Sequence, residues 1–419
     1  MDQNFFWGAA TSSHQVEGGN HNDWSEWELA ADQRGRNADS RGQETRAQKA
    51  ARLARKQQWP DYILNNYPNP LQEENYISGK ACDHYNRFRE DFDIAKSLGH
   101  NAHRFSIEWS RVEPEEGKFD EKEIAHYREV IRALRERGLE PFVTLWHWTL
   151  PVWLAEKGGV LNRDFPKLFS RYVEKVVAAY KNDVQFWITI NEPEIYAAQC
   201  YFRGVWSPQK KGPLNFFLAT HAIIRAHKAA YAAIKSNNAD ARVGIAKDNI
   251  YFSSSRWNIL GVLARKAMRW MWNYYFLERM REYQDFIGLN YYFHRHFGTH
   301  PKELRSDMGW GIYPHAFYHV LRELKPYGVP IYVTENGIAD ARDAHRAKFI
   351  RENIKWMKRA MNEGVDVRGY FYWSLLDNFE WDKGFWPRFG LVEVNYKTMK
   401  RTIRPSALEY KKIINSWPK

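Results

Sequence analysis

Short runs of apolar, β-branched and aromatic residues recur along the chain and predict buried strands. There are eight such runs, at residues 5–10, 102–107, 140–145, 186–191, 242–247, 285–289, 331–334 and 367–372. Segments with the spacing of amphipathic helices lie between them, among them 121–137, 165–180, 214–236, 316–324 and 344–362. This alternation predicts parallel strands that are joined by right-handed crossover helices.

The number of strand–helix units and the length of the chain narrow the fold class. Eight units in 419 residues fit an α/β fold, a single-domain (β/α)8 TIM barrel over residues 1–419. A doubly wound open sheet is the alternative. That fold would need a phosphate-binding turn after an early strand, and no glycine-rich loop stands there.

Polar side chains stand where several of the predicted strands end. The stretch "IYVTENGIAD" brings Glu335 to the end of one apolar run, and "FWITINEPE" brings Glu192 to the end of another. In TIM barrels the active site lies at the carboxyl ends of the strands. Further polar or aromatic candidates at these ends are Arg104, His147, Asn191, Asn290, Tyr292 and Trp373. Each alone could be a satisfied strand-end residue, but together they indicate a functional rim.

The amino-acid composition limits the classes of protein to which the chain can belong. Hydrophobic residues make up 44% of the chain and aromatic residues 16%, so a large core is possible. Two cysteines give neither a disulfide framework nor metal-ligand spacing.

The sequence contains no secretory leader and no apolar run long enough to cross a membrane, so we expect a cytoplasmic protein without a membrane partner. The net charge of +12 permits nucleic-acid binding, but we do not expect that function.

An insertion at about residues 31–80 follows the first predicted strand. Its part 34–56 carries eight basic residues, and 43–58 lacks Pro and Gly, so this part is expected to include a helix. A solvated basic surface is the expected role, and an electrostatic docking patch is the alternative. The part 59–76 is rich in aromatic residues and proline, and we expect it to lie over the barrel mouth.

A pair of carboxylates in one cleft suits the hydrolysis of a glycoside, in which one carboxyl donates a proton and the other attacks or activates water. The two groups must differ in pKa. Arg104 and a hydrogen bond from Tyr292 are expected to hold Glu335 anionic. Burial in the apolar run 186–190 and the second carboxylate should raise the pKa of Glu192. The sequence shows no candidate metal cluster and no G-x-S-x-G elbow, and we expect no cofactor.

Motifs from one end of the chain to the other resemble those of glycoside hydrolase family 1, the β-glucosidase and β-galactosidase family. They are "FFWGAATSSHQVEGG", "RFSIEWSRVEPEEGKFD", "TLWHWTLPVWL", "TINEP", "GLNYY", "YVTENGI", "YFYWSLLDNFEW" and "RFGLVEVNY", in that order. The resemblance implies a retaining β-glycosidase that forms a covalent glycosyl-enzyme intermediate. It also implies a small-molecule partner, a terminal β-linked sugar.

The resemblance implies a role for each matching position. Glu192 matches the general acid/base, Glu335 the nucleophile, and Asn191 the residue that binds the sugar 2-hydroxyl. The residues that would orient the nucleophile are Arg104, Asn290 and Tyr292. The residues that would bind the sugar or the leaving group are Gln15, His147, Trp148, Trp310, Trp373, Glu380, Trp381 and Phe389. For Trp148 and Trp381, core packing is the alternative.

Departures from the family pattern leave undecided which leaving groups the protein accepts. The segment 248–284 is shorter than usual, and we expect its remaining aromatic residues to be core. The alternatives are that they close a gap opened by the shortening or form a subunit contact. Two alternative functions stay in view: a 6-phospho-β-glycosidase and a catalytically inactive carbohydrate-binding barrel. Lys383 and Arg388 favour the first, whereas Glu380, Trp381 and the apolar stretch 385–387 favour unphosphorylated sugars.

Overall fold

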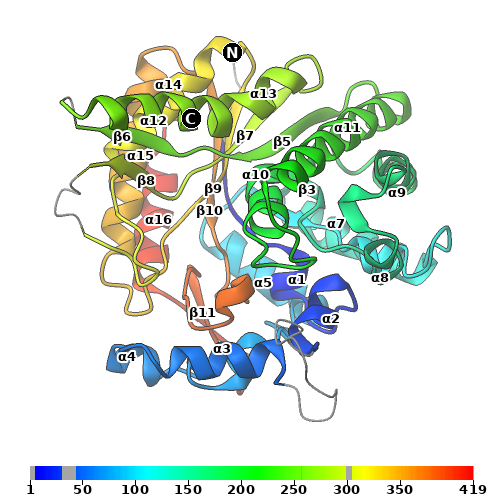
Figure 1. Ribbon diagram of the computed structural model, residues 1–419, viewed down its shortest axis with the longest axis horizontal. Helices are drawn as coiled ribbons and strands as arrows, with labels where there is room; N and C mark the ends of the chain where they lie inside the picture. Colours follow the sequence, from blue (N-terminus) through cyan, green and yellow to red (C-terminus); the bar gives the residue numbers. More distant parts are fainter. Residues whose placement is uncertain (1–4, 31–43, 256, 299–303, 419) are drawn as a thin grey trace.

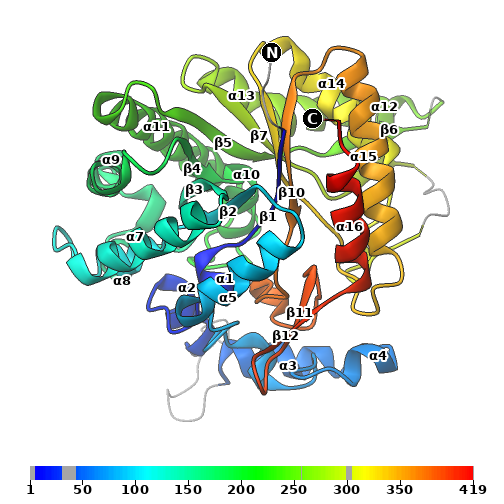
Figure 2. The same ribbon diagram turned by 180° about the vertical axis from the view of Figure 1, so that it is seen from behind.

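The computed structural model describes residues 5–30, 44–255, 257–298 and 304–418. Eight parallel strands close into a barrel in the order β1-β10-β9-β7-β5-β4-β3-β2, which confirms the predicted TIM barrel (Figures 1 and 2). All eight predicted strands are present. Their bounds are β1 (Phe6–Ala10), β2 (Ala102–Ser106), β3 (Glu140–Trp146), β4 (Phe186–Asn191), β5 (Arg242–Asp248), β7 (Phe286–Asn290), β9 (Ile331–Asn336) and β10 (Val367–Trp373).

Helices surround the barrel and connect its strands, as the helical spacing predicts. The long ones are α5 (His84–Ser97), α7 (Glu121–Glu136), α9 (Phe165–Tyr180), α11 (Pro213–Asn237), α12 (Ile259–Arg269), α14 (His315–Leu324), α15 (Arg346–Asn362) and α16 (Pro405–Asn415). The short ones are α1 (Ser13–Val16), α2 (Asp23–Leu29), α3 (Arg46–Ala54), α4 (Asp61–Leu64), α6 (Trp109–Val112), α8 (Val152–Glu156), α10 (Pro193–Ala197) and α13 (Tyr275–Met280).

Single helical turns and two small sheets complete the described structure. The turns are η1 (Glu73–Tyr76), η2 (Gly159–Leu161), η3 (Ala198–Phe202), η4 (Trp270–Tyr274), η5 (Lys325–Tyr327) and η6 (Trp381–Lys383). The small sheets pair β6 (Tyr251–Ser254) with β8 (His294–Phe297), and β11 (Val392–Asn395) with β12 (Lys400–Ile403).

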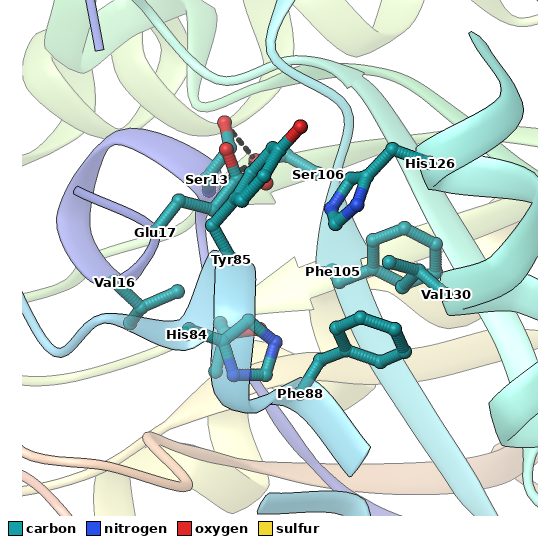
Figure 3. Close-up of a pocket in the computed structure, with 11 residues that line it drawn as sticks. Ser13, Val16, Glu17, His84, Tyr85, Phe88, Phe105, Ser106, His126 and Val130 are labelled. Atoms are coloured by element: carbon teal, nitrogen blue, oxygen red, sulfur yellow. Dashed lines mark hydrogen bonds between the residues drawn. The ribbon is translucent and has the colours of Figure 1, made fainter. Parts of the chain in front are cut away.

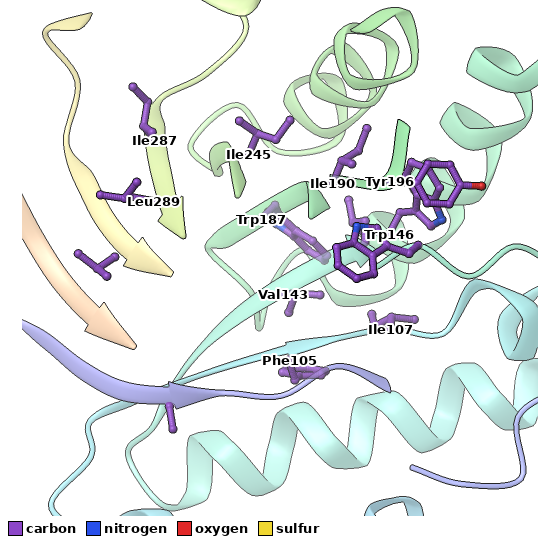
Figure 4. Close-up of a cluster of buried hydrophobic side chains, with 14 of the residues drawn as sticks. Phe105, Ile107, Val143, Trp146, Trp187, Ile190, Tyr196, Ile245, Ile287 and Leu289 are labelled. Atoms are coloured by element: carbon purple, nitrogen blue, oxygen red, sulfur yellow. The ribbon is translucent and has the colours of Figure 1, made fainter. Parts of the chain in front are cut away.

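The barrel interior is closed by aromatic rings that come from alternate positions on its strands. The rings of Phe142 and Phe186 stack with centroids 4.3 Å apart, and Tyr332 meets both of them edge-on. The next residues on the same strands point outward and pack under the helices, as Val143 and Trp187 do (Figure 4). Because the interior is filled, a site has to lie at an end of the barrel, and in TIM barrels it lies at the carboxyl end.

The pairing register shifts in the two strands that carry the predicted glutamates. In β4, Ile188 pairs with Gly244, but Asn191 pairs with Ala246, so one extra residue is accommodated. A second shift occurs against β9, where Leu289 pairs with Val333 and the next residue, Asn290, pairs with Glu335. Such bulges turn side chains to the opposite face of a strand. They bring Asn191 and Glu335 to the inside of the barrel.

The described part of the insertion covers residues 44–80, and the predicted helix is present as α3. The remainder, 31–43, lies outside the described residues. Trp59 lines a cavity of about 660 Å³ together with Trp310 and Trp386. The hydroxyl of Tyr62 donates to Asp307 at 2.8 Å. The stretch 59–76 therefore lies beside the barrel mouth, against the segment that carries Trp310.

The shortened segment between β5 and β7 does not form core in the way the sequence analysis expected. Phe276 is buried, but Trp257 is 88% exposed and Trp270 is 56% exposed. Tyr274 and Tyr275 are partly buried against the core, so the expectation holds for these two rings and Phe276. It was wrong for Trp257 and Trp270, where aromatic content was read as burial although surface residues can be aromatic as well. Within the described chain, no helix is long and apolar enough to cross a membrane.

Candidate active site

A cavity of about 470 Å³ opens at the carboxyl ends of the barrel strands. Its size is that of a pocket for a small molecule. Twelve of the fourteen predicted site residues line it: Gln15, His147, Trp148, Asn191, Glu192, Tyr292, Trp310, Glu335, Trp373, Glu380, Trp381 and Phe389. The other two, Arg104 and Asn290, are fully buried and contact these residues from below.

Arg104 lies at the centre of the site, and its guanidinium donates hydrogen bonds to three strands, two of them adjacent (β3 and β4) and one further round the barrel (β9). Its Nη1 donates to Glu335 Oε1 at 2.5 Å and to the carbonyl of Thr334, both on β9. Its Nη2 donates to Asn191 Oδ1 on β4 at 2.7 Å, and its Nε donates to Thr144 Oγ1 on β3 at 3.1 Å. One fixed cation thus aligns the strands that carry both glutamates.

Asn290, at the end of β7, forms hydrogen bonds with residues of both strands that lead to the glutamates, β4 and β9. Its Nδ2 donates to Glu192 Oε1 at 2.8 Å and to Asn191 Oδ1 at 3.1 Å. Its Oδ1 accepts a hydrogen bond from Thr334 Oγ1 at 2.7 Å. The amide therefore has both of its ends engaged, and this fixes which end faces Glu192.

Glu335 has the more strongly compensated negative charge. Burial raises the pKa of its carboxyl, while Arg104 and the hydroxyl of Tyr292, which donates to Oε2, act in the opposite direction and lower it. The expected contacts from Arg104 and Tyr292 are both present. They oppose the desolvation of the anion but do not cancel it, so the pKa of Glu335 stays above its ordinary value.

Glu192 stands at the start of α10 in a left-handed backbone conformation, with φ of 41°. Burial raises the pKa of Glu192 well above its ordinary value, and the carboxylates of Glu335 and Asp248 raise it further. Asn290 donates a hydrogen bond to it, and this contact lowers the pKa only in part. Glu192 therefore keeps its proton to higher pH than Glu335 does, because Glu335 also touches a guanidinium.

Asp248 is a third buried carboxyl in the cavity, and the sequence analysis missed it. It ends β5, and Trp272 Nε1 donates to its Oδ2 at 3.1 Å. Burial raises its pKa to about 6, so it is ionised at neutral pH and acts on Glu192. Asp248 directly follows the fifth predicted strand. This position could have identified it, because the other candidate residues were chosen as polar residues at strand ends.

One wall of the cavity carries a chain of hydrogen-bonded polar groups. Gln15 accepts from Ser12 at 2.9 Å, and its Nε2 donates to Asn378 Oδ1 at 3.0 Å and to Glu380 Oε2 at 3.3 Å. Burial, with the charge of Glu335, raises the pKa of Glu380 to about 8. At neutral pH Glu380 is thus mostly protonated, and it can donate one hydrogen bond and accept others.

Aromatic rings surround this polar chain. The ring of His147 lies nearly parallel to those of Trp373 and Trp381, with centroids 6.1 and 6.0 Å away. Burial, together with the nearby Arg104, keeps the pKa of His147 well below its usual range, so its ring is neutral. Trp148 donates from Nε1 to the Asn191 carbonyl at 2.8 Å. Trp148 therefore supports the strand end as well as lining the cavity.

The outer side of the cavity is bounded by Tyr292, Trp310 and Phe389. The ring of Trp310 lies 5.7 Å from that of Tyr292 and 6.1 Å from that of Phe389. Trp310 also lines the neighbouring cavity that Trp59 borders, so the two cavities meet at this indole. A molecule held at the two glutamates could extend past Trp310 toward the insertion.

A separate small cavity of about 10 Å³ lies beside Glu17, His84 and His126 (Figure 3). Glu17 accepts from Arg111 at 3.0 Å and from Tyr127 at 2.9 Å. A space of this size holds at most about one water molecule. The buried carboxylate of Glu17 has its hydrogen-bond partners, and the cavity is too small to be a substrate site.

Comparisons with known proteins find the same architecture. The family described as Glycosyl hydrolase family 1 matches residues 1–280 and 259–417. The chain is 32% identical to beta-glucosidase A of Thermotoga maritima over 99% of this chain and 97% of that protein. It is also 32% identical to a 1,4-beta-D-glucan glucohydrolase of Thermotoga neapolitana, over 99% and 98% of the two chains.

Solved structures agree with these sequence matches. A beta-glycosidase from Pyrococcus horikoshii superposes with a TM-score of 0.83 at 35% identity, covering 99% of this chain and 95% of that one. The beta-glucosidase from Thermotoga maritima in complex with glucoimidazole superposes with a TM-score of 0.81 at 30% identity, covering 99% and 98%.

The Asp248→Asn variant should shift the basic limb of a pH–rate profile. Because the charge of Asp248 raises the pKa of Glu192, its removal lowers that pKa, and Glu192 loses its proton at lower pH. We expect the basic limb of kcat/KM to move to lower pH for a β-glycoside whose poor leaving group needs a proton.

Asp382→Asn is the matched control, since Asp382 acts on the pKa of Glu380 instead. The control should leave the limb in place. A basic limb that stays where it is in Asp248→Asn would show that the charge of Asp248 does not act on Glu192.

Proposed function

Because the chain belongs to glycosyl hydrolase family 1, we propose that it is a retaining β-glycosidase of β-glucosidase type. Its substrates would be terminal, unphosphorylated β-linked sugars, and it would act through a covalent glycosyl-enzyme intermediate. The observation that carries this proposal is the pair of buried carboxyls in unlike surroundings. Glu335 touches Arg104, whereas Glu192 has an amide and two neighbouring carboxylates.

In the first step, an ionised Glu335 attacks the anomeric carbon and forms an ester to the sugar. The glycosidic C–O bond breaks, and the proton of Glu192 goes to the departing oxygen. The contacts of Glu335 with Arg104 and Tyr292 support this assignment because they favour its anion and fix its direction. The high pKa of Glu192 supports its role as the proton donor.

In the second step, Glu192 is left ionised and takes a proton from a water molecule. The water oxygen bonds to the anomeric carbon, and the ester to Glu335 breaks. Two displacements on the same carbon give a product with the β configuration. Once the positive charge that develops on the sugar is gone, Arg104 again lies against the free carboxylate of Glu335.

Recognition of the sugar would use the opposite wall of the cavity. Gln15 and Glu380 present an amide and a carboxyl side by side, which suits neighbouring hydroxyls. Trp373 offers an apolar face for the C–H groups of the ring. Asn191 is held by Arg104 and by His147 at 3.1 Å, and it would bind the 2-hydroxyl. Relatives described as a beta-glucosidase and a glucan glucohydrolase support a glucose-type sugar.

A 6-phospho-β-glycosidase is the second candidate, and Lys383 is the observation that favours it, since this cation lines the cavity. It pairs with Asp382 at 2.7 Å. The other basic candidate, Arg388, is buried and directed elsewhere, toward Asp377 and the carbonyls of Val394 and Tyr67. Beside Glu380 a phosphate would therefore meet a lysine that already pairs with Asp382, and a carboxyl that can donate at most one hydrogen bond, which favours unphosphorylated sugars.

Replacing Glu335 or Glu192 by alanine should lower the hydrolytic activity to different extents. Glu335→Ala should lower kcat by roughly 10⁵-fold or more on any substrate, because the nucleophile has no substitute. Glu192→Ala should keep rapid glycosylation by an aryl β-glucoside with an activated leaving group, which needs no proton.

Azide should then rescue both variants with opposite stereochemistry, since it replaces the nucleophile in one variant and the second-step water in the other. We expect an α-glucosyl azide from Glu335→Ala and a β-glucosyl azide from Glu192→Ala, read by NMR. Near wild-type hydrolysis by Glu335→Ala would refute the assignment.

Substrate charge can be tested directly with an aryl β-glucoside and its 6-phosphate. We expect kcat/KM to favour the neutral glucoside by about 10²-fold or more, because the phosphate would stand beside the carboxyl of Glu380 and a lysine that already pairs with Asp382. Glu380→Ser should lower kcat/KM for the neutral glucoside. A preference for the phosphate, or an undiminished neutral reaction in Glu380→Ser, would contradict the proposed substrate class.

A further inference from the structure

The solvent-facing side of α12 is apolar, which reverses the usual orientation of a surface helix. Ile259, Leu260 and Leu263 are 75%, 79% and 57% exposed, and Trp270 continues the same face two turns later. The basic side chain Arg269 instead lies on the protein side, where it pairs with Glu323 at 2.9 Å. In Figure 1 this helix lies on the near side of the molecule, and it is fainter in Figure 2.

Ring contacts extend this apolar face to the start of α11. The centroids of Trp270 and Tyr275 are 5.4 Å apart, and those of Tyr275 and Phe217 are 6.4 Å apart. The series ends with Phe216 and Phe202, 6.0 Å apart. Beside it, Leu214 and Leu218 are exposed. We call this surface the α11–α12 patch, comprising Phe202, Leu214, Phe217, Leu218, Ile259, Leu260, Leu263 and Trp270.

The two stretches that form the α11–α12 patch contribute charges of one sign. The two stretches of sequence that form it, 195–239 and 249–277, contain no Asp or Glu. Exposed cations stand beside its apolar residues: Arg203 next to Phe202, Lys210 and Lys211 before Leu214, and Lys266 on the outer face of α12. The next acid along the chain, Glu278, lies 4.0 Å from Arg281. The patch is therefore apolar with a basic border.

We propose that the α11–α12 patch docks the protein onto the surface of an anionic lipid bilayer. A helix with outward Trp, Ile and Leu and neighbouring Lys and Arg can lie in the interface, with its apolar side chains about 5–10 Å deep. The basic border would lie at the level of the anionic headgroups, which attract Lys and Arg side chains near the membrane surface. Since no helix in the described chain can span a bilayer, this contact would be peripheral.

A second copy of the chain fits this surface less well. A two-fold contact would place the patch on itself, because both subunits present the same residues in such an interface. The basic borders would then face each other with no acid from either stretch to pair with them. Like charges opposed across an interface disfavour association, whereas a negatively charged bilayer complements both the apolar centre and its border.

Flotation with lipid vesicles tests the proposal. The probes are vesicles of phosphatidylcholine alone and of phosphatidylcholine with about 30% phosphatidylglycerol. We expect the full-length protein to float with the anionic vesicles and to bind neutral ones weakly. Leu260→Ser with Leu263→Ser should lower the partition coefficient for anionic vesicles about tenfold or more. Lys266→Glu should lower it about fivefold or more and make the residual binding less sensitive to salt.

Matched controls separate docking from general changes of the surface. Leu29→Ser with Leu408→Ser removes two leucines that are 57% and 50% exposed elsewhere, and Lys348→Glu reverses an exposed charge on α15. Both controls should bind as the wild type does, and the thermal unfolding midpoint should show that every variant is folded. Activity is not the readout, so this test does not depend on the proposed glycosidase function.

Three outcomes would overturn the proposal. In the first, the wild type remains unbound or binds neutral and anionic vesicles equally. In the second, the variant with both Leu260→Ser and Leu263→Ser binds as the wild type does, which would mean that charge alone attracts the protein. In the third, the wild type is a dimer in light scattering that the same variant converts to a monomer, which would make the patch a subunit interface.

Discussion

A buried guanidinium holds the site together. Arg104 is 1% exposed, and its hydrogen bonds reach β3, β4 and β9. Removing one member of such a buried ion pair costs about 3–5 kcal/mol, because the other charge is left without a partner. The cation therefore fixes the position of Glu335 and, through Asn191 and Asn290, that of Glu192. The different pKa shifts of the two glutamates follow from this placement.

The barrel and most of the site could be predicted from the sequence. The eight apolar runs have the spacing of strands, and TIM barrels place polar strand-end residues on one rim. The inward direction of Glu335 was not predictable from alternation alone. Tyr332 and Thr334 already face inward, so strict alternation would have turned Glu335 outward. The register shift that brings it inside is a property of the pairing between strands, and one strand read alone does not reveal it.

Asp248 and the aromatic segment after it show why the rest was missed. The burial of Asp248 depends on Trp272, which arrives from 24 residues further along the chain. The apolar residues of α12 have helical spacing, but spacing does not tell which face meets the protein. From the sequence we expected the aromatic residues of this segment to be core and made no prediction for the apolar face of α12, whereas the ion pair of Arg269 with Glu323 lies on the opposite face of the helix. In both cases a tertiary contact decided the outcome.

The central claim is that Glu335 forms the covalent bond to the sugar, and trapping that bond tests it most directly. A 2-deoxy-2-fluoro-β-glucoside with an activated leaving group slows the second step more than the first, so the ester accumulates. The account predicts inactivation with one fluoroglucosyl group per chain, located by mass spectrometry on the peptide that contains Glu335 and absent from Glu335→Ala. A label on Glu192 or on any other residue, or steady turnover with no label, would contradict it.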